Sequence, residues 1–258
     1  MNEQNLITYY NKFNEDKRLN TRHGQVEFIT SMKYIHEYLK DMKSPKILDI
    51  GAGCGRYSGT LSNEEYDVTA IELVKHNLRV IEKNYPKVKA YQGNAINLSK
   101  FENNSFDLVL LFGPMYHLCN NEDQIKALQE AKRVMKKDGI LIVAYCMNEY
   151  AVITHGFKEN YIHDCISSNQ LDNRFHCRPN DNDLYHYMRL EDIDYLNQQV
   201  GLTRIKIVSA DGPANYMRNI LNKMDDITFD KFMEYHLSTC ERLDLIGASA
   251  HTIDILTK

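Results

Sequence analysis

Residues 47–56 have the sequence ILDIGAGCGR, and this stretch decides the fold. Its first four residues predict a buried parallel strand, and the three glycines that follow at alternate positions predict a tight turn. The next run, Arg56 to Leu61, can open a helix. The pattern is therefore strand, tight turn and helix.

Each glycine has a separate expected role. Gly51 and Gly53 can adopt backbone angles closed to other residues, and without a Cβ they let a ligand lie against the main chain. Gly55 lets the helix and the strand pack closely. Arg56 stands where a dinucleotide-binding fingerprint would have its last glycine, which disfavours a diphosphate site. Asp49, at the end of the strand, favours a ligand that carries a cation.

A second acid follows the next predicted strand. Residues 67–71 are mostly apolar and β-branched, and Glu72 comes directly after them. A carboxylate at the tip of the second strand is placed to accept hydrogen bonds from ribose hydroxyls. A glycine turn alone also occurs as an ordinary strand-to-helix connection, but together with Glu72 it indicates an adenosine site without a diphosphate.

These residues carry a family resemblance. Residues 47–56 and Glu72 resemble the first two signature motifs of class I S-adenosylmethionine-dependent methyltransferases, and the likeness covers roughly residues 46–146. The resemblance implies an α/β, Rossmann-like, doubly wound sheet of seven mostly parallel strands, the last one antiparallel. It implies S-adenosyl-L-methionine as the cofactor and S-adenosyl-L-homocysteine as the product. The residues expected to contact the cofactor are Asp49, Gly51, Ala52, Gly53, Gly55, Glu72, Leu73, Asn94, Ala95, Phe112 and Gly113.

The remaining pattern suits this fold. Asn94 occupies a position where the family usually has an acid, but its amide oxygen can still accept a hydrogen bond from the adenine amino group. The segment 136–139 predicts a turn. Helices are expected at residues 75–84, 124–135, 191–200, 216–224 and 230–245. Further strands are expected at residues 88–92, 106–112, 140–146, 202–209 and 251–256.

Length and composition limit the function classes. A chain of 258 residues can form one α/β domain with insertions. We expect a helical lid at 1–44, a cofactor-binding core at 45–147, and substrate-covering insertions at 148–190 and 211–248. The later insertion is as well suited to packing or to a homodimer contact. The net charge of -4 disfavours nucleic acid as a partner.

Location is inferred from what the sequence contains. It shows no signal peptide and no apolar run near the roughly 20 residues needed to cross a bilayer. The 6 cysteines form no C-x-x-C pair. We therefore expect a cytoplasmic protein with reduced thiols and no membrane partner.

A basic joint lies between two expected N-terminal helices. The resemblance implies that this segment folds over the cofactor, and Arg18 or Arg22 could then hold the methionine carboxylate by a charge-assisted pair. A solvated charged turn is the equal alternative for each arginine.

Catalytic candidates follow the fourth and fifth strands. Tyr116 and His117 end the segment FGPMYH, which leaves the sheet at the edge where open α/β sheets bind ligands. His155 is the best candidate in the first insertion to face the pocket. Each could act as a base for a hydroxyl or amine acceptor, or simply form the pocket wall. Methyltransferases of adenine or glutamine amides carry an Asp or Asn, two prolines and an aromatic residue here, and the sequence FGPMYHL is not that motif, so this chemistry is disfavoured.

Histidines and cysteines gather in the first insertion. A metal site could use His163, Cys165, His176 and Cys177, but the adjacent pair at 176 and 177 is unlike a closed zinc site, and we expect no metal. Three functions stay open: methyl transfer to a small-molecule acceptor, methyl transfer to RNA or protein, and non-catalytic S-adenosylmethionine binding. Nothing in the sequence identifies the receiving atom.

Overall fold

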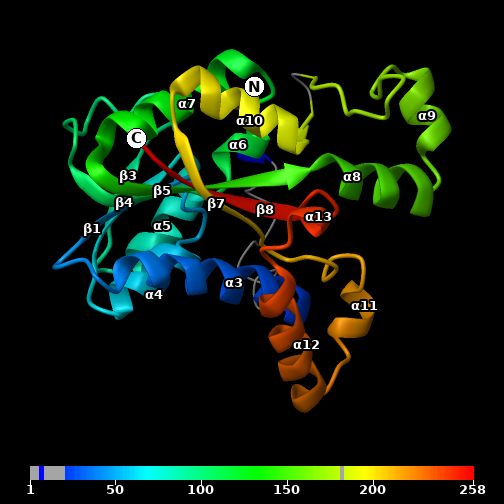
Figure 1. Ribbon diagram of the computed structural model, residues 1–258. Coiled ribbons are helices and arrows are strands. Elements are labelled where there is room, and N and C mark those ends of the chain that lie inside the picture. The colour runs from blue at the N-terminus through cyan, green and yellow to red at the C-terminus, as the bar shows by residue number, and fades with distance from the viewer. Residues whose placement is uncertain (1–5, 9–20, 181–182) are drawn as a thin grey trace.

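The computed structural model describes residues 6–8, 21–180 and 183–258. A single sheet runs through the molecule, with helices above and below it (Figure 1). The strands are β1 (Lys46–Ile50), β2 (Asp67–Glu72), β3 (Lys89–Gln92), β4 (Phe106–Leu111), β5 (Met135–Met147), β6 (Tyr187–Met188), β7 (Thr203–Ser209) and β8 (His251–Thr257).

The sheet has the predicted doubly wound topology. Its order is β3-β2-β1-β4-β5-β8-β7, and the short β6 pairs with β5 away from this path. The pairs from β3 to β5 are parallel, whereas β8 runs antiparallel to both β5 and β7. The expectation of a mostly parallel Rossmann-like sheet with an antiparallel last strand is confirmed, but the short β6, which was not predicted, makes eight strands in place of the seven expected.

Helices cover both faces, and the central strands are buried for that reason. On one face α7 (Asn121–Val134) and α10 (Leu190–Val200) pack over β1, β4 and β5. On the other face lie α3 (Arg22–Leu39), α4 (Arg56–Asn63) and α5 (Lys75–Asn84). Figure 1 shows the first pair above the sheet and the second group below it.

Local chemistry explains where α7 and α4 begin. The side chain of Asn120 accepts a hydrogen bond of 2.8 Å from Asp123 N, so α7 begins before the predicted residue 124. Gly55 precedes α4 with a φ of 83°, a left-handed conformation that glycine adopts readily. Residues 136–139 do not form the expected turn. They lie within β5, where the pairing with β4 shifts register.

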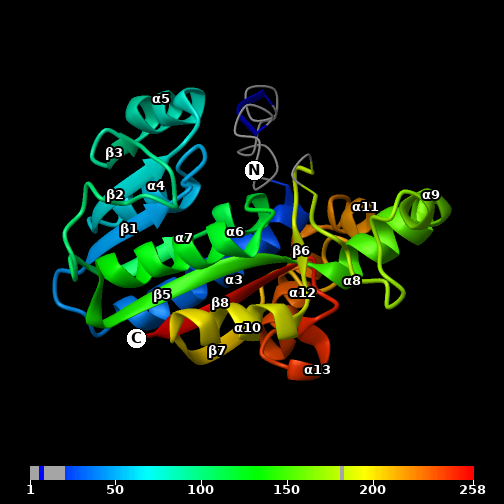
Figure 2. The same ribbon diagram turned by 90° about the horizontal axis from the view of Figure 1, so that it is seen from above.

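The two insertions lie beyond the carboxyl end of the parallel strands (Figure 1). The first contains α8 (Asn148–Ala151), a π-helix (Val152–Lys158), α9 (Ile162–Ser167) and β6. The second contains α11 (Arg218–Leu221), α12 (Asp226–Thr239) and α13 (Leu243–Ile246), which are shorter or more broken than predicted. In the two views α11 and α12 lie beside the start of α3 (Figures 1 and 2). Among the described residues, no helix has the length and apolar character that crossing a bilayer requires.

Candidate active site

The glycine turn after β1 forms one wall of a cavity. Gly51, Gly53 and Gly55 all have positive φ angles, of 75°, 56° and 83°. A Cβ on Gly51 would lie 2.6 Å from the Pro114 ring, so only glycine allows α6 (Pro114–His117) to approach this closely. A Cβ on Gly53 would meet nothing within 4 Å, because this residue faces open space. The turn thus offers bare main chain to a ligand.

Glu72 lies at the tip of β2 and is held against this turn. Its two carboxylate oxygens accept hydrogen bonds from the backbone N–H groups of Gly53, at 2.7 Å, and Val74, at 2.8 Å. Burial raises the pKa of Glu72 to about 7, against the opposing effect of these donors. The side chain is fixed in place and titrates near neutral pH.

Asp49 supplies a second buried carboxyl at the same edge. Its Oδ2 accepts a 2.5 Å hydrogen bond from the Ser58 hydroxyl, whereas Oδ1 has no partner among the described residues. Burial raises the pKa of Asp49 to about 6. A buried carboxylate oxygen without a donor costs free energy, which a ligand that donates a hydrogen bond or carries a cation would recover.

The other residues expected at the cofactor share this cavity. Phe112 closes it from the end of β4, with its ring packed edge-on at 4.9 Å against Tyr57. The expected residues that line the cavity are Asp49, Gly51, Ala52, Gly53, Glu72, Leu73, Asn94, Ala95, Phe112 and Gly113. Gly55 does not line it and instead allows α4 to pack against Ile81 of α5.

Tyr116 and His117 line the same cavity from α6. Their rings pack edge-on at 4.8 Å. Burial lowers the pKa of His117 to about 4, so the ring is neutral at neutral pH. Its Nδ1 lies 2.7 Å from the Leu184 carbonyl oxygen, an arrangement that assigns the ring proton to Nδ1 as the donor. His117 therefore ties α6 to the first insertion.

Two of the expected residues, His155 and Arg22, are not brought to the cavity. His155 lies on the exposed π-helix, 3.0 Å from the Glu159 carboxylate and stacked on Tyr161. Arg22 turns outward to an ion pair of 2.5 Å with Asp226. Neither lines the cavity. Arg18 lies outside the described residues.

Arg56 is a cavity residue that sequence reasoning did not select. Its guanidinium carbon lies 4.5 Å from the centroid of the Phe28 ring, and its buried Nε has no hydrogen-bond partner among the described residues. It lines the cavity beside the glycine turn. Its place directly after G-x-G-x-G was the available signal, because the first residue of α4 must lie next to a ligand held by the turn.

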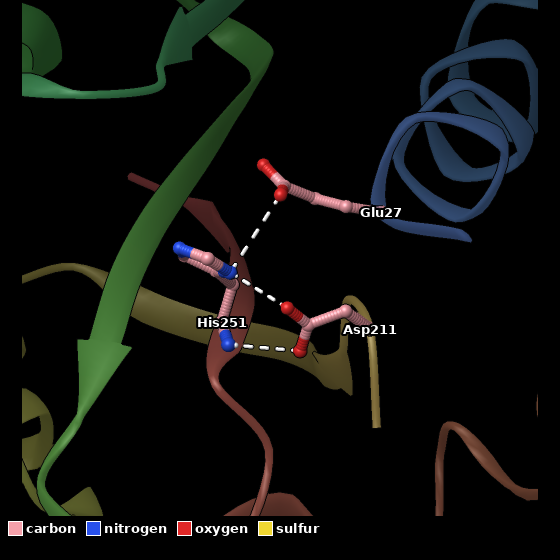
Figure 3. A group of neighbouring side chains, drawn as sticks. All are labelled: Glu27, Asp211 and His251. Carbon is pink, nitrogen blue, oxygen red and sulfur yellow. Dashed lines mark hydrogen bonds and ion pairs between the residues drawn. The ribbon is translucent and has the colours of Figure 1, made fainter. Parts of the chain in front are cut away.

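A second missed group lies beside β8, which β1, β4 and β5 separate from the β2 strand of Glu72 in the sheet. His251 opens β8 and Asp211 follows β7, and the antiparallel pairing of these strands brings them together. His251 Nδ1 lies 2.6 Å from Asp211 Oδ2 and 3.6 Å from the carboxylate of Glu27 on α3 (Figure 3). Glu27 and His251 line the cavity. Each pair of these residues is separated by at least 40 positions in the sequence, so no local motif reveals them.

The described residues contain one group of three potential metal ligands, and it is Glu27, Asp211 and His251. The four residues weighed as a metal site do not form such a group. Cys165 and Cys177 pack in one small cluster, but His176 pairs with Asp192 at 2.9 Å.

The comparisons with known proteins agree with this geometry. A model of the methyltransferase domain family matches residues 48–143. A release factor glutamine methyltransferase from Buchnera aphidicola is 24% identical over 145 residues, which is 47% of this chain and 50% of that protein. A glycine/sarcosine N-methyltransferase from Aphanothece halophytica is 27% identical over 128 residues, 48% of each chain. The chain spans about half the length of these curated relatives.

Solved structures show the same fold over most of the chain. An S-adenosylmethionine-dependent methyltransferase from Methanosarcina mazei has a TM-score of 0.59 at 18% identity and covers 87% of this chain and 96% of its own. A possible histamine N-methyltransferase from Thermotoga maritima has a TM-score of 0.56 at 19% identity and covers 97% of both chains. Residues 48–143 therefore match the methyltransferase domain family, and the chain has the fold seen in solved S-adenosylmethionine-dependent methyltransferases.

Proposed function

We propose that this protein transfers a methyl group from S-adenosylmethionine to a small-molecule acceptor inside the cavity. One observation carries the proposal. The buried acids beside the glycine turn and the side chains of Tyr116 and His117 line one continuous cavity, so a cofactor and an acceptor could meet there.

The residues at the glycine turn suit the cofactor. Glu72 presents a carboxylate to ribose hydroxyls, and Gly53 leaves room for the adenosyl group against the main chain. Asp49 offers the unpaired Oδ1 to a donor or a cation. Asn94 also lines the cavity, and we assign it to the adenine amino group. S-adenosylmethionine supplies a methyl group on a sulfonium, which a nucleophile accepts without covalent help from the protein.

Arg56 is the better candidate for the methionine carboxylate. Arg22 pairs with Asp226, whereas Arg56 lines the cavity and its buried Nε has no hydrogen-bond partner among the described residues. A carboxylate in this position would give a charge-assisted hydrogen bond. We therefore assign to Arg56 the role that the sequence pattern gave to Arg18 or Arg22.

Several features support a small acceptor over a polymer. The net charge is -4, so the chain has no overall basic field for nucleic acid. The acceptor end is lined by aromatic and apolar side chains such as Tyr116, Phe112 and Ile253, which suits a compact organic molecule. The segment Gly113-Pro114-Met115-Tyr116 lacks the second proline expected for amide methylation, although one relative is a glutamine methyltransferase.

Two measurements test the proposal. Calorimetry with S-adenosylmethionine and S-adenosylhomocysteine should show binding of both, and Glu72→Ala should abolish it. A screen of a metabolite library for S-adenosylhomocysteine formation should then identify the acceptor. Binding without turnover on any metabolite, together with turnover on RNA or protein fractions, would contradict a small acceptor. Absence of cofactor binding would overturn the whole proposal.

A further inference from the structure

The group formed by Glu27, Asp211 and His251 borders the cavity, which Glu27 and His251 line, and the proposed function so far gives this group no role. Asp211 is fully buried, and the side chain of His251 keeps 20% of its surface exposed. The His251 ring also packs 6.4 Å from the ring of Tyr116. The group therefore borders the space in which an acceptor would lie.

Asp211 holds the imidazole in one orientation. Its Oδ2 accepts hydrogen bonds from His251 Nδ1, at 2.6 Å, and from Asn215, at 2.6 Å. Its Oδ1 accepts from the Ser249 hydroxyl and from the backbone N–H groups of Ala250 and His251. Five donors saturate this carboxylate, which leaves no lone pair for a metal ion and keeps it ionised. The arrangement is that of a carboxylate orienting a histidine.

The orientation leaves one ring nitrogen for chemistry. Because Nδ1 donates to Asp211, Nε2 is the basic nitrogen when the ring is neutral. Figure 3 shows Nε2 on the side of the ring away from both carboxylates. Nε2 has no hydrogen-bond partner among the described residues. It can therefore take a proton from a molecule in the cavity.

We propose that His251, oriented by Asp211, accepts the proton that a hydroxyl or amine acceptor loses when it is methylated. The acceptor oxygen or nitrogen bonds to the methyl carbon, and the carbon–sulfur bond breaks with its electron pair left on sulfur. The acceptor proton passes to His251 Nε2 and then to water. This inference rests on the proposed function and narrows the acceptor to a compound with an O–H or N–H group.

The charges around His251 set its proton affinity. Burial alone lowers the pKa of His251, but the carboxylates of Glu27 and Asp211 outweigh burial and raise that pKa well above its usual value. The other titratable groups facing it are Cys146 on β5, Tyr116 on α6 and Tyr150 on α8. A cation in the cavity would oppose the two carboxylates.

The effect of a bound cation on the pKa of His251 can be tested without an acceptor. The ring nitrogens of His251 are followed by NMR across a pH titration of the full chain, first with S-adenosylhomocysteine and then with S-adenosylmethionine. We expect the neutral ring to carry its proton on Nδ1 in both complexes. The sulfonium adds one positive charge, which at about 10 Å and an effective dielectric constant of about 20 should lower the pKa of His251 by about one unit.

The exposed pair of His36 on α3 and Glu64 at the end of α4, 2.7 Å apart, is the internal control. The NMR signals of the His36 ring, compared at one fixed pH, should be the same in both complexes. An equal pKa of His251 in both complexes, or a proton on Nε2 of the neutral ring, would overturn the inference while leaving cofactor binding intact. If neither compound binds, the proposed function fails and this inference fails with it.

A variant separates orientation from simple packing. Glu27→Gln should lower the pKa of His251 and keep the proton on Nδ1, whereas Asp211→Asn should lose the preference for Nδ1. If Asp211→Asn does not fold, Glu27→Gln still tests the proposal. An unchanged pKa of His251 in Glu27→Gln would contradict its electrostatic basis.

Discussion

Cofactor affinity should depend steeply on pH, because two buried carboxyls at the glycine turn must ionise. The pKa of Glu72 is raised to about 7 and that of Asp49 to about 6, both by burial. A raised pKa keeps a carboxyl protonated and uncharged up to that pH. The ionised carboxylates accept stronger hydrogen bonds from the ribose hydroxyls than the protonated acids do, and only the ionised form attracts a cation, so affinity should rise as the pH increases through these values.

The size of the effect follows from the two pKa values. At about pH 5.5 a carboxyl with a pKa of about 7 is ionised in roughly one molecule in thirty, and one with a pKa of about 6 in roughly one in four. Near pH 8 both are ionised. The dissociation constant for S-adenosylhomocysteine should therefore be about 100-fold larger at the lower pH, of which about 30-fold comes from Glu72.

Calorimetric titration with S-adenosylhomocysteine at several pH values measures this dependence. Glu72→Gln should bind about 10- to 100-fold more weakly near pH 8, because hydrogen bonds to a charged group contribute about 1.5–3 kcal/mol. It should also retain only the smaller pH dependence due to Asp49. Glu82→Gln, an exposed change on the neighbouring α5, is the control. An affinity independent of pH in the wild type would refute the reasoning.

Three further changes probe the cavity. Gly53→Ala puts a methyl group into the open space of the turn at a φ of 56°, and should weaken S-adenosylhomocysteine binding at least about tenfold, measured by calorimetry. Arg56→Gln should weaken it by about 10- to 100-fold through loss of a charge-assisted bond, whereas the exposed Arg79→Gln should not change it. His117→Ala should lower turnover more than cofactor affinity, and equal turnover in mutant and wild type would remove His117 as a catalyst.

The cofactor end was predictable from sequence because its residues belong to short, continuous patterns. A glycine turn after a buried strand places Asp49 and Gly53 at the sheet edge, and a β-branched strand ending in an acid places Glu72 beside them. The strand order then follows from alternating strands and helices, which require right-handed crossovers. These inferences need only neighbours along the chain.

The acceptor end was harder because its parts come from distant segments. His155 seemed suitable from its position soon after the fifth strand, but a π-helix carries it to the surface. Asp211 and His251 lie on either side of an insertion, and they meet only because β7 and β8 pair antiparallel. The available signal was the expected antiparallel last strand, because its first residue, His251, then lies at the sheet edge where the parallel strands end.

The pH dependence of turnover should differ according to which cavity histidine, His117 or His251, acts as the base. The pKa of His117 is lowered to about 4, so a rate that depended on neutral His117 would be constant from mildly acidic pH upward. The carboxylates of Glu27 and Asp211 outweigh burial and raise the pKa of His251, so a rate that needs neutral His251 should rise with pH above neutrality.

Glu27→Gln removes one of the two carboxylates and should move this rise to lower pH, while a rate controlled by His117 should not respond. The measurement is kcat against pH with saturating S-adenosylmethionine and an acceptor from the library screen, so that the change in cofactor affinity does not enter. A flat profile in the wild type, or a rise that stays in place in Glu27→Gln, would assign the proton to a group other than His251.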